Sequence, residues 1–273
     1  MTARRVGRLT LYSLDDGTFP FPAALFFGNV PEAEWRRYVE VDAAGKIPVG
    51  HNYALIETER DLIVVDTGYG DDTHGGRAGH LLDELTRTGH RRDHVTAVVN
   101  THAHGDHIKR NTIIRGHRRE ATFSRARYHL ARDDWTWFSG PGHVPEFDEH
   151  IVTLERRGVL TLTERDMELA SGVSLRSTPG HTPGHTSVVL ESEGSTAIVL
   201  GDLCHLPLHF QHPNWTSTFD TQPDRTPRTR AELFAFAIER NALILCTHTP
   251  SPGLGHIVPT ADSFRWQPLS TSS

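Results

Sequence analysis

The sequence predicts a layered α/β protein that forms one domain over residues 1–273. Its length is enough for one large α/β domain or two small ones, and no Pro-, Gly- or Ser-rich linker divides the chain. Short apolar strands recur between helical segments, which is typical of this fold class. In addition, clusters of His and Asp follow directly after several predicted strands, where layered α/β folds gather their ligands.

The composition indicates a globular protein with a substantial core. Hydrophobic residues make up 37% of the chain and charged residues 23%, with a formal net charge of -6. No basic face suggests a nucleic-acid partner. No secretory signal and no apolar run long enough to span a bilayer is present in the sequence. We therefore expect a cytoplasmic protein without nucleic-acid or membrane partners, and we keep a homodimer as an open alternative to a monomer.

The predicted strands are short apolar runs bounded by turn residues. They cover residues 8–14, 52–56, 61–66, 95–99, 122–124, 160–162, 173–176, 186–190, 197–200 and 242–246. The predicted helices cover residues 31–39, 77–88, 125–137 and 226–238. The first strand is expected to end at residues 15–17, and the proline-broken segment 19–27 cannot pair in the middle of a sheet. Residues 206–225 predict a long loop, and the tail from Gln267 is expected to be irregular.

The densest chemical signal is the run T-H-A-H-G-D-H at residues 101–107, directly after the strand 95–99. Side chains alternate in an extended backbone, so His102, His104 and Asp106 tend toward one side, and His107 falls in the first turn that follows. Protonated histidines would repel one another, whereas neutral ones offer lone pairs that a divalent cation satisfies. A polar loop with incidental histidines is the alternative, and four ligand-type side chains at this spacing argue against it.

Three later segments repeat the same arrangement. Residues 178–186 form a Pro- and Gly-rich turn with two histidines, His181 and His185. Asp202 follows the strand 197–200, and His248 follows the strand 242–246. Taken singly, each could be an ordinary turn residue. Together with residues 101–107 they place ligand-type side chains at the ends of several strands, and this pattern predicts a metal site.

These motifs, with D-T-G at residues 66–68 upstream, resemble the metallo-β-lactamase superfamily. The resemblance implies an αββα sandwich with two divalent metal ions, zinc by default, with iron, manganese or cobalt as alternatives. It assigns one metal to His102, His104 and His185, the other to Asp106, His107 and His248, and a bridging position to Asp202. His181 is expected to be a turn residue or to support the ligands, and Asp66 to hydrogen-bond a ligand or the loop 101–107 and fix its orientation.

Within the superfamily, the sequence is most similar to N-acyl-homoserine lactonases and to methyl parathion hydrolase-like proteins. The resemblance implies a hydrolase in which a metal-activated water attacks an ester-type bond, most simply that of a lactone. A phosphotriesterase or aryl-ester hydrolase is the main alternative. A metal-binding protein without enzymatic activity is the remaining one, and it would bind metal without turning over any ester.

The resemblance also suggests two catalytic residues and a pocket. Asp106 is expected to carry a proton to the leaving group. His205 stands where the lactonases have a tyrosine and the parathion hydrolase-like proteins a histidine, and it is expected to donate to the oxygen that gains charge. The alternative is a structural histidine that holds the loop 206–225. Aromatic residues are expected to line the substrate pocket, with plain core packing as the alternative: Phe19, Phe21, Phe26, Phe27, Trp135, Trp137 and Phe138.

Overall fold

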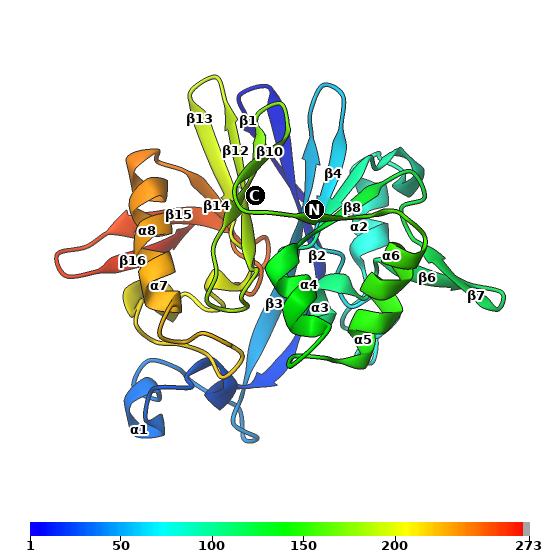
Figure 1. Cartoon of the computed structure of the whole chain (residues 1–273). Helices are drawn as coiled ribbons and strands as arrows, with labels where there is room; N and C mark the ends of the chain where they lie inside the picture. The colour runs from blue at the N-terminus through cyan, green and yellow to red at the C-terminus, as the bar shows by residue number, and fades with distance from the viewer. Residues whose placement is uncertain (270–273) are drawn as a thin grey trace.

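The computed structural model describes residues 1–269, and within them two β-sheets pack face to face with helices on their outer faces (Figure 1). The predicted αββα sandwich is thus confirmed. Each of these sheets has seven strands over the described residues, and a separate two-stranded ribbon projects from the first half of the chain.

The first sheet is antiparallel at one side and parallel at the other. Its strands, in spatial order, are β1 (Thr2–Val6), β2 (Leu9–Pro22), β3 (Lys46–Glu57), β4 (Leu62–Val65), β5 (Ala97–Val99), β8 (Arg127–Ala131) and β9 (Leu160–Thr163). The pairs β4–β5, β5–β8 and β8–β9 are parallel. The carboxyl ends of these strands therefore meet at one edge, and the run 101–107 leaves the sheet there.

The second sheet follows later in the chain. Its strands, in spatial order, are β10 (Met167–Ala170), β11 (Val173–Ser177), β12 (Thr186–Ser192), β13 (Ser195–Val199), β14 (Leu243–Leu245), β15 (Leu254–Pro259) and β16 (Phe264–Pro268). The pair β13–β14 is parallel, so Asp202 and His248 emerge from the same edge of this sheet. The ribbon consists of β6 (Thr112–Arg115) and β7 (Arg118–Ala121).

The helices are short except for α8. They are α1 (Glu32–Trp35), α2 (Leu81–Arg87), α3 (Gly105–Ile108), α4 (Arg132–Phe138), α5 (Pro145–Phe147), α6 (Thr153–Arg156), α7 (Leu208–Gln211) and α8 (Thr226–Glu239). The shorter turns are the 3₁₀ segments η1 (Ala23–Phe26), η2 (Arg92–His94) and η4 (Gly201–Leu203) and the π segment η3 (Asp148–Val152). Among the described residues, no helix has the length and apolarity that crossing a membrane requires.

The strands are apolar on both faces because each sheet is covered by the other sheet on one face and by helices on the other. On β3, Ala54 and Ile56 face the core between the two sheets, whereas Tyr53 and Leu55 face the layer that contains α2. On β13, Ile198 faces the core that contains α8. Strands buried on both faces read as continuous apolar runs rather than alternating ones. This explains why these segments were recognisable in the sequence.

The helix predicted over residues 125–137 is wrong in its first half and confirmed in its second. The chain first forms the strand β8, which pairs in parallel with β5, and only then the helix α4. On β8, Tyr128 packs in the layer beneath α2, whereas Leu130 packs near α4 and α5. These two side chains lie on the same, helix-covered face of the sheet, and their burial together with the pairing to β5 outweighs the local helical pattern. The short strand predicted at residues 122–124 is absent from this part of the described chain.

Strand β2 does not end at residues 15–17 as predicted. It bends there through a bulge between Asp15 and Gly17 and continues to Pro22, paired with β3. Strand β1 pairs with β2 only as far as Ser13, so the second half of β2 lies at the edge of the sheet. An edge position tolerates Pro20 and Pro22 because their missing N–H groups face no neighbouring strand. Gln267, expected in an irregular tail, lies within β16, and residues 270–273 are outside the described residues.

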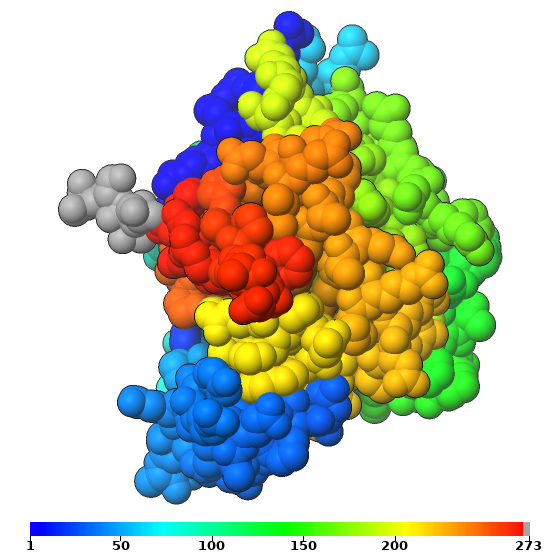
Figure 2. All heavy atoms as spheres, turned by 90° about the vertical axis from the view of Figure 1, so that its left-hand side faces the viewer, coloured from blue at the N-terminus to red at the C-terminus, as the bar shows by residue number. Residues whose placement is uncertain are grey.

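A small lobe beyond the edge of the sheets forms one wall of the site. It contains η1 and α1, and it lies against the segment that holds α7 (Figure 2, blue against yellow). Backbone hydrogen bonds join the two segments, from Gly28 N to Thr216 O (2.7 Å) and from Thr218 N to Leu25 O (2.8 Å). The residues 206–225, predicted as a loop, are therefore mostly irregular but include α7 and are held by this lobe.

Candidate metal centre

Three histidines converge at the end of strand β5. His104 Nδ1 lies 3.0 Å from His102 Nε2 and 3.0 Å from His181 Nε2. All three side chains stand at the shared edge of the two sheets, two from the run 101–107 and one from the Pro- and Gly-rich turn. Three ring nitrogens that face one another at this distance form a compact set of donors for one cation.

A second group lies beside the first. Asp106 Oδ2 is 3.5 Å from His107 Nε2 and 3.5 Å from His248 Nε2. Asp202 Oδ1 is 3.3 Å from His107 Nε2, and its other oxygen, Oδ2, is 3.5 Å from His181 Nε2 in the first group. One carboxylate therefore faces both groups of histidines.

The outer ring nitrogens show how these histidines are oriented. In four of them Nδ1 points away from the centre toward an oxygen atom: His107 to Asp66 Oδ2 (2.8 Å), His181 to Asp220 Oδ1 (2.9 Å), His248 to Gly50 O (3.0 Å) and His102 to Thr101 Oγ1 (3.0 Å). Because Nδ1 donates its proton outward, the lone pair of Nε2 points inward. His107 Nε2 and Asp202 Oδ1 are buried and lack a hydrogen-bond partner. This donor set fits divalent cations.

The protonation states agree with that fit. Burial lowers the pKa of His104 to about 3, assisted by repulsion from His181, and burial likewise lowers the pKa of His102. His107 differs: burial opposes its charged form, but the carboxylates of Asp202 and Asp106 outweigh this and raise its pKa well above the usual value. A cation in this place would take the role of that proton, because metal binding releases protons from its ligands.

Asp66 makes the contact that the sequence predicts. Its carboxylate, which is buried, accepts hydrogen bonds from Thr101 N (2.7 Å), from Thr101 Oγ1 (2.8 Å) and from His107 Nδ1 (2.8 Å). It thereby ties the start of the run 101–107 to its last member. The ring of His107 is fixed in one orientation as a result.

The structure places His181, and not the predicted His185, in the first group. His185 lies four residues later in the same turn, but both of its ring nitrogens are already used. Its Nδ1 lies 3.0 Å from Thr178 O, and its Nε2 accepts a hydrogen bond from Asp202 N at 3.0 Å. A Cβ atom at Gly201 would stand 2.6 Å from His185 Nε2, so this contact also requires glycine there. His185 therefore orients the Asp202 backbone, and the prediction that it completes the first group is corrected.

A cavity of about 210 Å³ opens onto both groups. Its lining combines acidic and imidazole side chains of the centre with an apolar wall: Phe21, Phe26, Val49, His51, Tyr69, His104, Asp106, His181, Asp202, His205, Phe219 and His248. His205 Nε2 lies 3.3 Å from Asp202 Oδ2, and both of its ring nitrogens lack a hydrogen-bond partner. His205 thus faces the centre, as its position in the sequence suggests.

The aromatic residues predicted for the pocket divide into two sets. Phe21 and Phe26 line the cavity. Five others do not: Phe19, Phe27, Trp135, Trp137 and Phe138. Phe19 and Phe27 are buried in the clusters around Tyr69 and Trp35, and the α4 residues pack against Phe147 from α5. Their prediction as pocket residues is corrected, because these rings pack against other clusters and not on the cavity; Trp135 and Trp137 are partly buried there.

Sequence reasoning missed several residues that the fold brings to the centre. Asp220, which holds His181 Nδ1, lies in a segment without periodicity, and no local signal marks it. Tyr69, Val49 and Phe219 look like ordinary apolar residues in the sequence. His51 has a usable signal, because it is a histidine inside a largely apolar segment.

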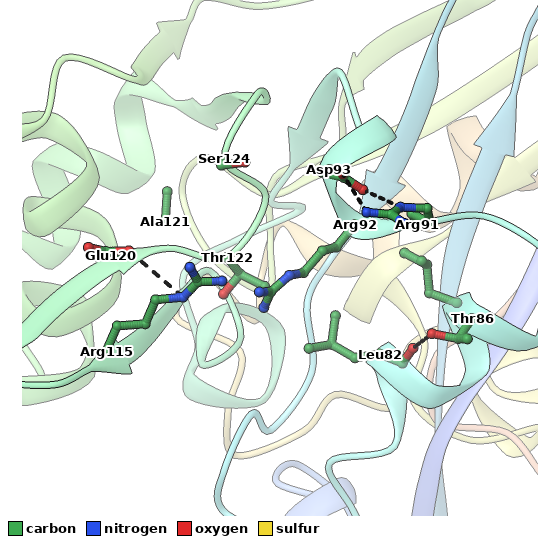
Figure 3. Close-up of a pocket in the computed structure, with 11 residues that line it drawn as sticks. Leu82, Thr86, Arg91, Arg92, Asp93, Arg115, Glu120, Ala121, Thr122 and Ser124 are labelled. Atoms are coloured by element: carbon green, nitrogen blue, oxygen red, sulfur yellow. Dashed lines mark hydrogen bonds and ion pairs between the residues drawn. The ribbon is translucent and has the colours of Figure 1, made fainter.

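A larger cavity, of about 440 Å³, lies elsewhere, between α2, η2 and the ribbon (Figure 3). Arginine and acidic side chains line it. Arg91 pairs with Asp93 through two contacts of 2.9 and 3.1 Å, and Arg115 Nε lies 3.9 Å from Glu120. None of the metal-type groups found among the described residues includes a residue of this arginine cavity.

The fold and the histidine centre together define a class. Besides the two groups described above, His181, Asp202 and His205 form a third, which shares His181 and Asp202 with them. An αββα sandwich whose sheet edges present such groups of His and Asp is the framework of a metal-dependent hydrolase. The chain belongs to the metallo-β-lactamase superfamily, whose family model matches residues 47–207, more than half of its 273 residues.

The individual relatives share only about a quarter of their residues with this chain. An N-acyl homoserine lactonase from a Bacillus species is 26% identical over 187 residues, which span 62% of this chain and 69% of that enzyme. The structure is similar to AidC, a dizinc quorum-quenching lactonase solved in complex with a product (TM-score 0.82, 25% identity, 100% of this chain and 98% of AidC covered). The fold is also that of the beta-lactamase superfamily hydrolase AbOPH (TM-score 0.86, 23% identity, 99% of this chain and 98% of AbOPH covered).

Proposed function

We propose that the protein hydrolyses a neutral ester, with a lactone of the N-acyl-homoserine type as the preferred substrate, and that it uses two divalent metal ions. The observation that carries the proposal is Asp202, whose carboxylate lies within 3.5 Å of histidines of both groups, His107 and His248 in one and His181 in the other. The similarity to an N-acyl homoserine lactonase and to AidC supports the choice of a lactone.

The residues that would hold the metals follow from the two groups. His102, His104 and His181 would hold one ion, Asp106, His107 and His248 would hold the other, and Asp202 would contact both. When bound, the two ions supply a Lewis acid that activates a water molecule and polarises the ester carbonyl. Zinc is the default for imidazole and carboxylate ligands, with iron, manganese or cobalt as alternatives.

Asp106 is suited to move a proton. Its side chain lines the cavity and is 21% exposed, whereas that of Asp202 is 4% exposed. Asp106 can therefore take a proton from the attacking water and reach the leaving oxygen within the same cavity. Tyr53 from β3 donates a hydrogen bond to the backbone oxygen of Asp106, which holds this residue in place.

His205 is suited to stabilise charge on the substrate. Its ring faces the cavity, and neither ring nitrogen has a hydrogen-bond partner. Burial lowers the pKa of His205 by more than the nearby carboxylate of Asp202 raises it, so the ring is neutral near pH 7. A neutral N–H here can donate to the oxygen that becomes negative as the carbonyl is attacked.

The apolar wall of the cavity selects a compact substrate. Phe21, Phe26, Val49 and Phe219 would contact the acyl part. The cavity of about 210 Å³ lies below the range of roughly 300–1,000 Å³ that is common for small-molecule sites. We therefore expect short acyl chains to be preferred over long ones.

A second candidate function is hydrolysis of aryl esters or phosphotriesters. It is favoured by the sequence G-D-L-C-H at residues 201–205, a pattern shared with methyl parathion hydrolase-like proteins, together with the position of His205 in the cavity. The same residues would act on a phosphoryl oxygen in the way described for a carbonyl.

One experiment tests both candidates. Protein loaded with zinc, manganese, iron or cobalt is analysed for metal content and assayed on N-acyl-homoserine lactones, aryl esters, phosphotriesters and thioesters. We expect about two metal equivalents per chain and the highest kcat/KM on a short-chain lactone. Turnover of phosphotriesters alone would favour the second candidate. Bound metal without turnover of any ester would contradict both.

A further inference from the structure

His51 is a polar group in the cavity to which the proposed function assigns no role. It lies on β3 within the cavity lining, and its side chain is fully buried. Both of its ring nitrogens lack a hydrogen-bond partner. An imidazole with two unpartnered nitrogens away from water is costly for the folded protein, because each buried polar group normally finds a partner.

The other unpartnered atoms at the centre have an explanation. His107 Nε2 and Asp202 Oδ1 point into the metal-type groups, and His205 Nε2 lies beside Asp202. His51 belongs to none of the groups whose ligand atoms gather within 4.8 Å of one another among the described residues. A metal ion in either group would therefore leave His51 without a partner.

The position of the His51 ring is set by its neighbours. It stacks on Phe19 at 4.6 Å with an interplanar angle of 6°, and it meets Tyr69 edge-on at 5.0 Å. On the side of the centre, its ring lies 4.9 Å from that of His248. A ring held by contacts on several sides has little freedom to lose when a ligand binds, so its nitrogens are pre-organised.

His51 and His205 lie on different walls of the cavity. His205 stands beside Phe26 (5.6 Å between ring centroids) and Phe219 (6.1 Å), whereas His51 stands beside Phe19 and Tyr69. The cavity therefore offers hydrogen-bonding imidazoles at two separate places. A substrate that satisfied both would need a second polar group besides the carbonyl that is attacked.

We propose that His51 binds this second polar group of the substrate, an uncharged hydrogen-bond acceptor such as the amide carbonyl of an N-acylated lactone. The inference rests on the proposed hydrolytic function and narrows its substrate class to esters that carry an amide or a similar acceptor near the ester bond. Rejection of substrates without that acceptor follows, because they leave the buried nitrogens unpaired.

The test compares two lactones on variants of this position. His51→Phe keeps a flat ring on Phe19 and removes both nitrogens, and His51→Gln restores a donor. The substrates are N-hexanoyl-homoserine lactone and a γ-alkyl butyrolactone, which has the same ring and no amide. For His51→Phe we expect kcat/KM on the amide-bearing lactone to fall about 10- to 100-fold, mainly through KM, with less than about a threefold change on the alkyl lactone. His51→Gln should recover part of the loss.

A matched control is His129→Phe. His129 on β8 is also buried and also has an unpartnered nitrogen, Nδ1, but it does not line the cavity. It should leave the ratio of kcat/KM values for the two lactones unchanged. Metal content and melting temperature are measured for every variant, and calorimetry with the zinc-loaded protein measures binding of the ring-opened product N-hexanoyl-homoserine, which should weaken by the same factor in His51→Phe.

The outcomes separate the inference from the proposed function. Equal losses on both lactones, or loss of metal from His51→Phe, would show that His51 is structural or a ligand and would overturn the inference alone. If the wild type cleaves only aryl esters, the lactone proposal falls, and phenyl esters of N-acetylglycine and of butyric acid provide the same comparison. If the wild type neither turns over an ester nor binds the product, both proposals are overturned.

Discussion

The cavity that opens onto the histidine groups, called the histidine cavity below, and the arginine cavity differ in how many of their polar groups have a hydrogen-bond or ion-pair partner. The arginine cavity is larger, about 440 Å³ against about 210 Å³, but two pairs of its charged side chains lie against each other, Arg91 with Asp93 and Arg115 with Glu120. One hydroxyl there, Thr122 Oγ1, lacks a partner. In the histidine cavity, His51, Asp202 and His205 present unpartnered atoms, and His107 next to Asp202 presents another. Unpartnered buried polar atoms, rather than volume, therefore mark the place where chemistry can occur.

Exposure separates the two cavities as well. The side chains of Arg91 and Asp93 are 72% and 40% exposed, so water and salt screen their attraction. The side chains of His107 and Asp202 are 0% and 4% exposed, so removal of one charged partner has a much larger energetic effect there. This difference sets the expected order of the following effects.

The largest effect is expected from Asp202→Ala. Because Asp202 faces both groups of histidines, its removal should lose most of the bound metal and lower kcat/KM by at least about 10³-fold. Metal analysis and steady-state kinetics measure the two losses on the same sample. Full activity with a single metal equivalent in the wild type would contradict the two-metal proposal.

The next effect distinguishes the two histidines of the Pro- and Gly-rich turn. His181→Ala should remove one metal equivalent and lower kcat/KM by about 10²- to 10³-fold, because its Nε2 faces His104 and Asp202. His185→Ala should keep both equivalents and instead lower the free energy of unfolding by about 1–3 kcal/mol, because Asp202 N loses its acceptor. Loss of one metal equivalent from His185→Ala and none from His181→Ala would show that His185 is the ligand.

His205→Phe should reduce kcat by about 10²- to 10³-fold, the usual cost of losing one donor to a developing negative charge. Two metal equivalents and the melting temperature should be retained, since His205 has no hydrogen bond through its ring to the rest of the protein. A fall in metal content together with activity would make His205 a ligand. Activity within about twofold of the wild type would make it a structural residue.

A smaller effect is expected from the apolar wall. Phe26→Ala should raise KM more for longer acyl chains than for shorter ones, because each buried methylene contributes about 0.8 kcal/mol. Trp137→Ala is the matched control, since Trp137 packs near Phe147 and does not line the cavity. Its chain-length dependence should equal that of the wild type. If both variants show the same dependence on chain length, Phe26 does not contact the acyl chain.

The smallest effect is expected in the arginine cavity. Arg91→Ala removes an exposed ion pair with Asp93, which should change the free energy of unfolding by less than about 1 kcal/mol. The kcat/KM on every ester should stay within about twofold, because no unpartnered group of the histidine cavity is affected. A large loss of activity would show that this cavity takes part in the reaction.

The sequence predicted the parts of the site that are local in the chain. Residues 101–107 and the residues that follow β13 and β14 stand at strand ends, and a strand end is recognisable from a few neighbouring residues. The contact of Asp66 with His107 also followed from a motif. The helix predicted over 125–137 failed in part because β8 is stabilised by β5, which lies far away in the sequence.

By itself, the sequence determined the class of the protein, the layered fold and the kinds of side chain at the centre. Only the tertiary structure decided which histidine of residues 178–186 faces that centre. His181 and His185 have almost identical local sequences, and their roles differ because Asp220 takes the outer nitrogen of His181 while Thr178 and the Asp202 backbone occupy both nitrogens of His185. Asp220 and Asp202 lie outside this turn, and a hydrogen bond between separate segments exists only once the chain has folded.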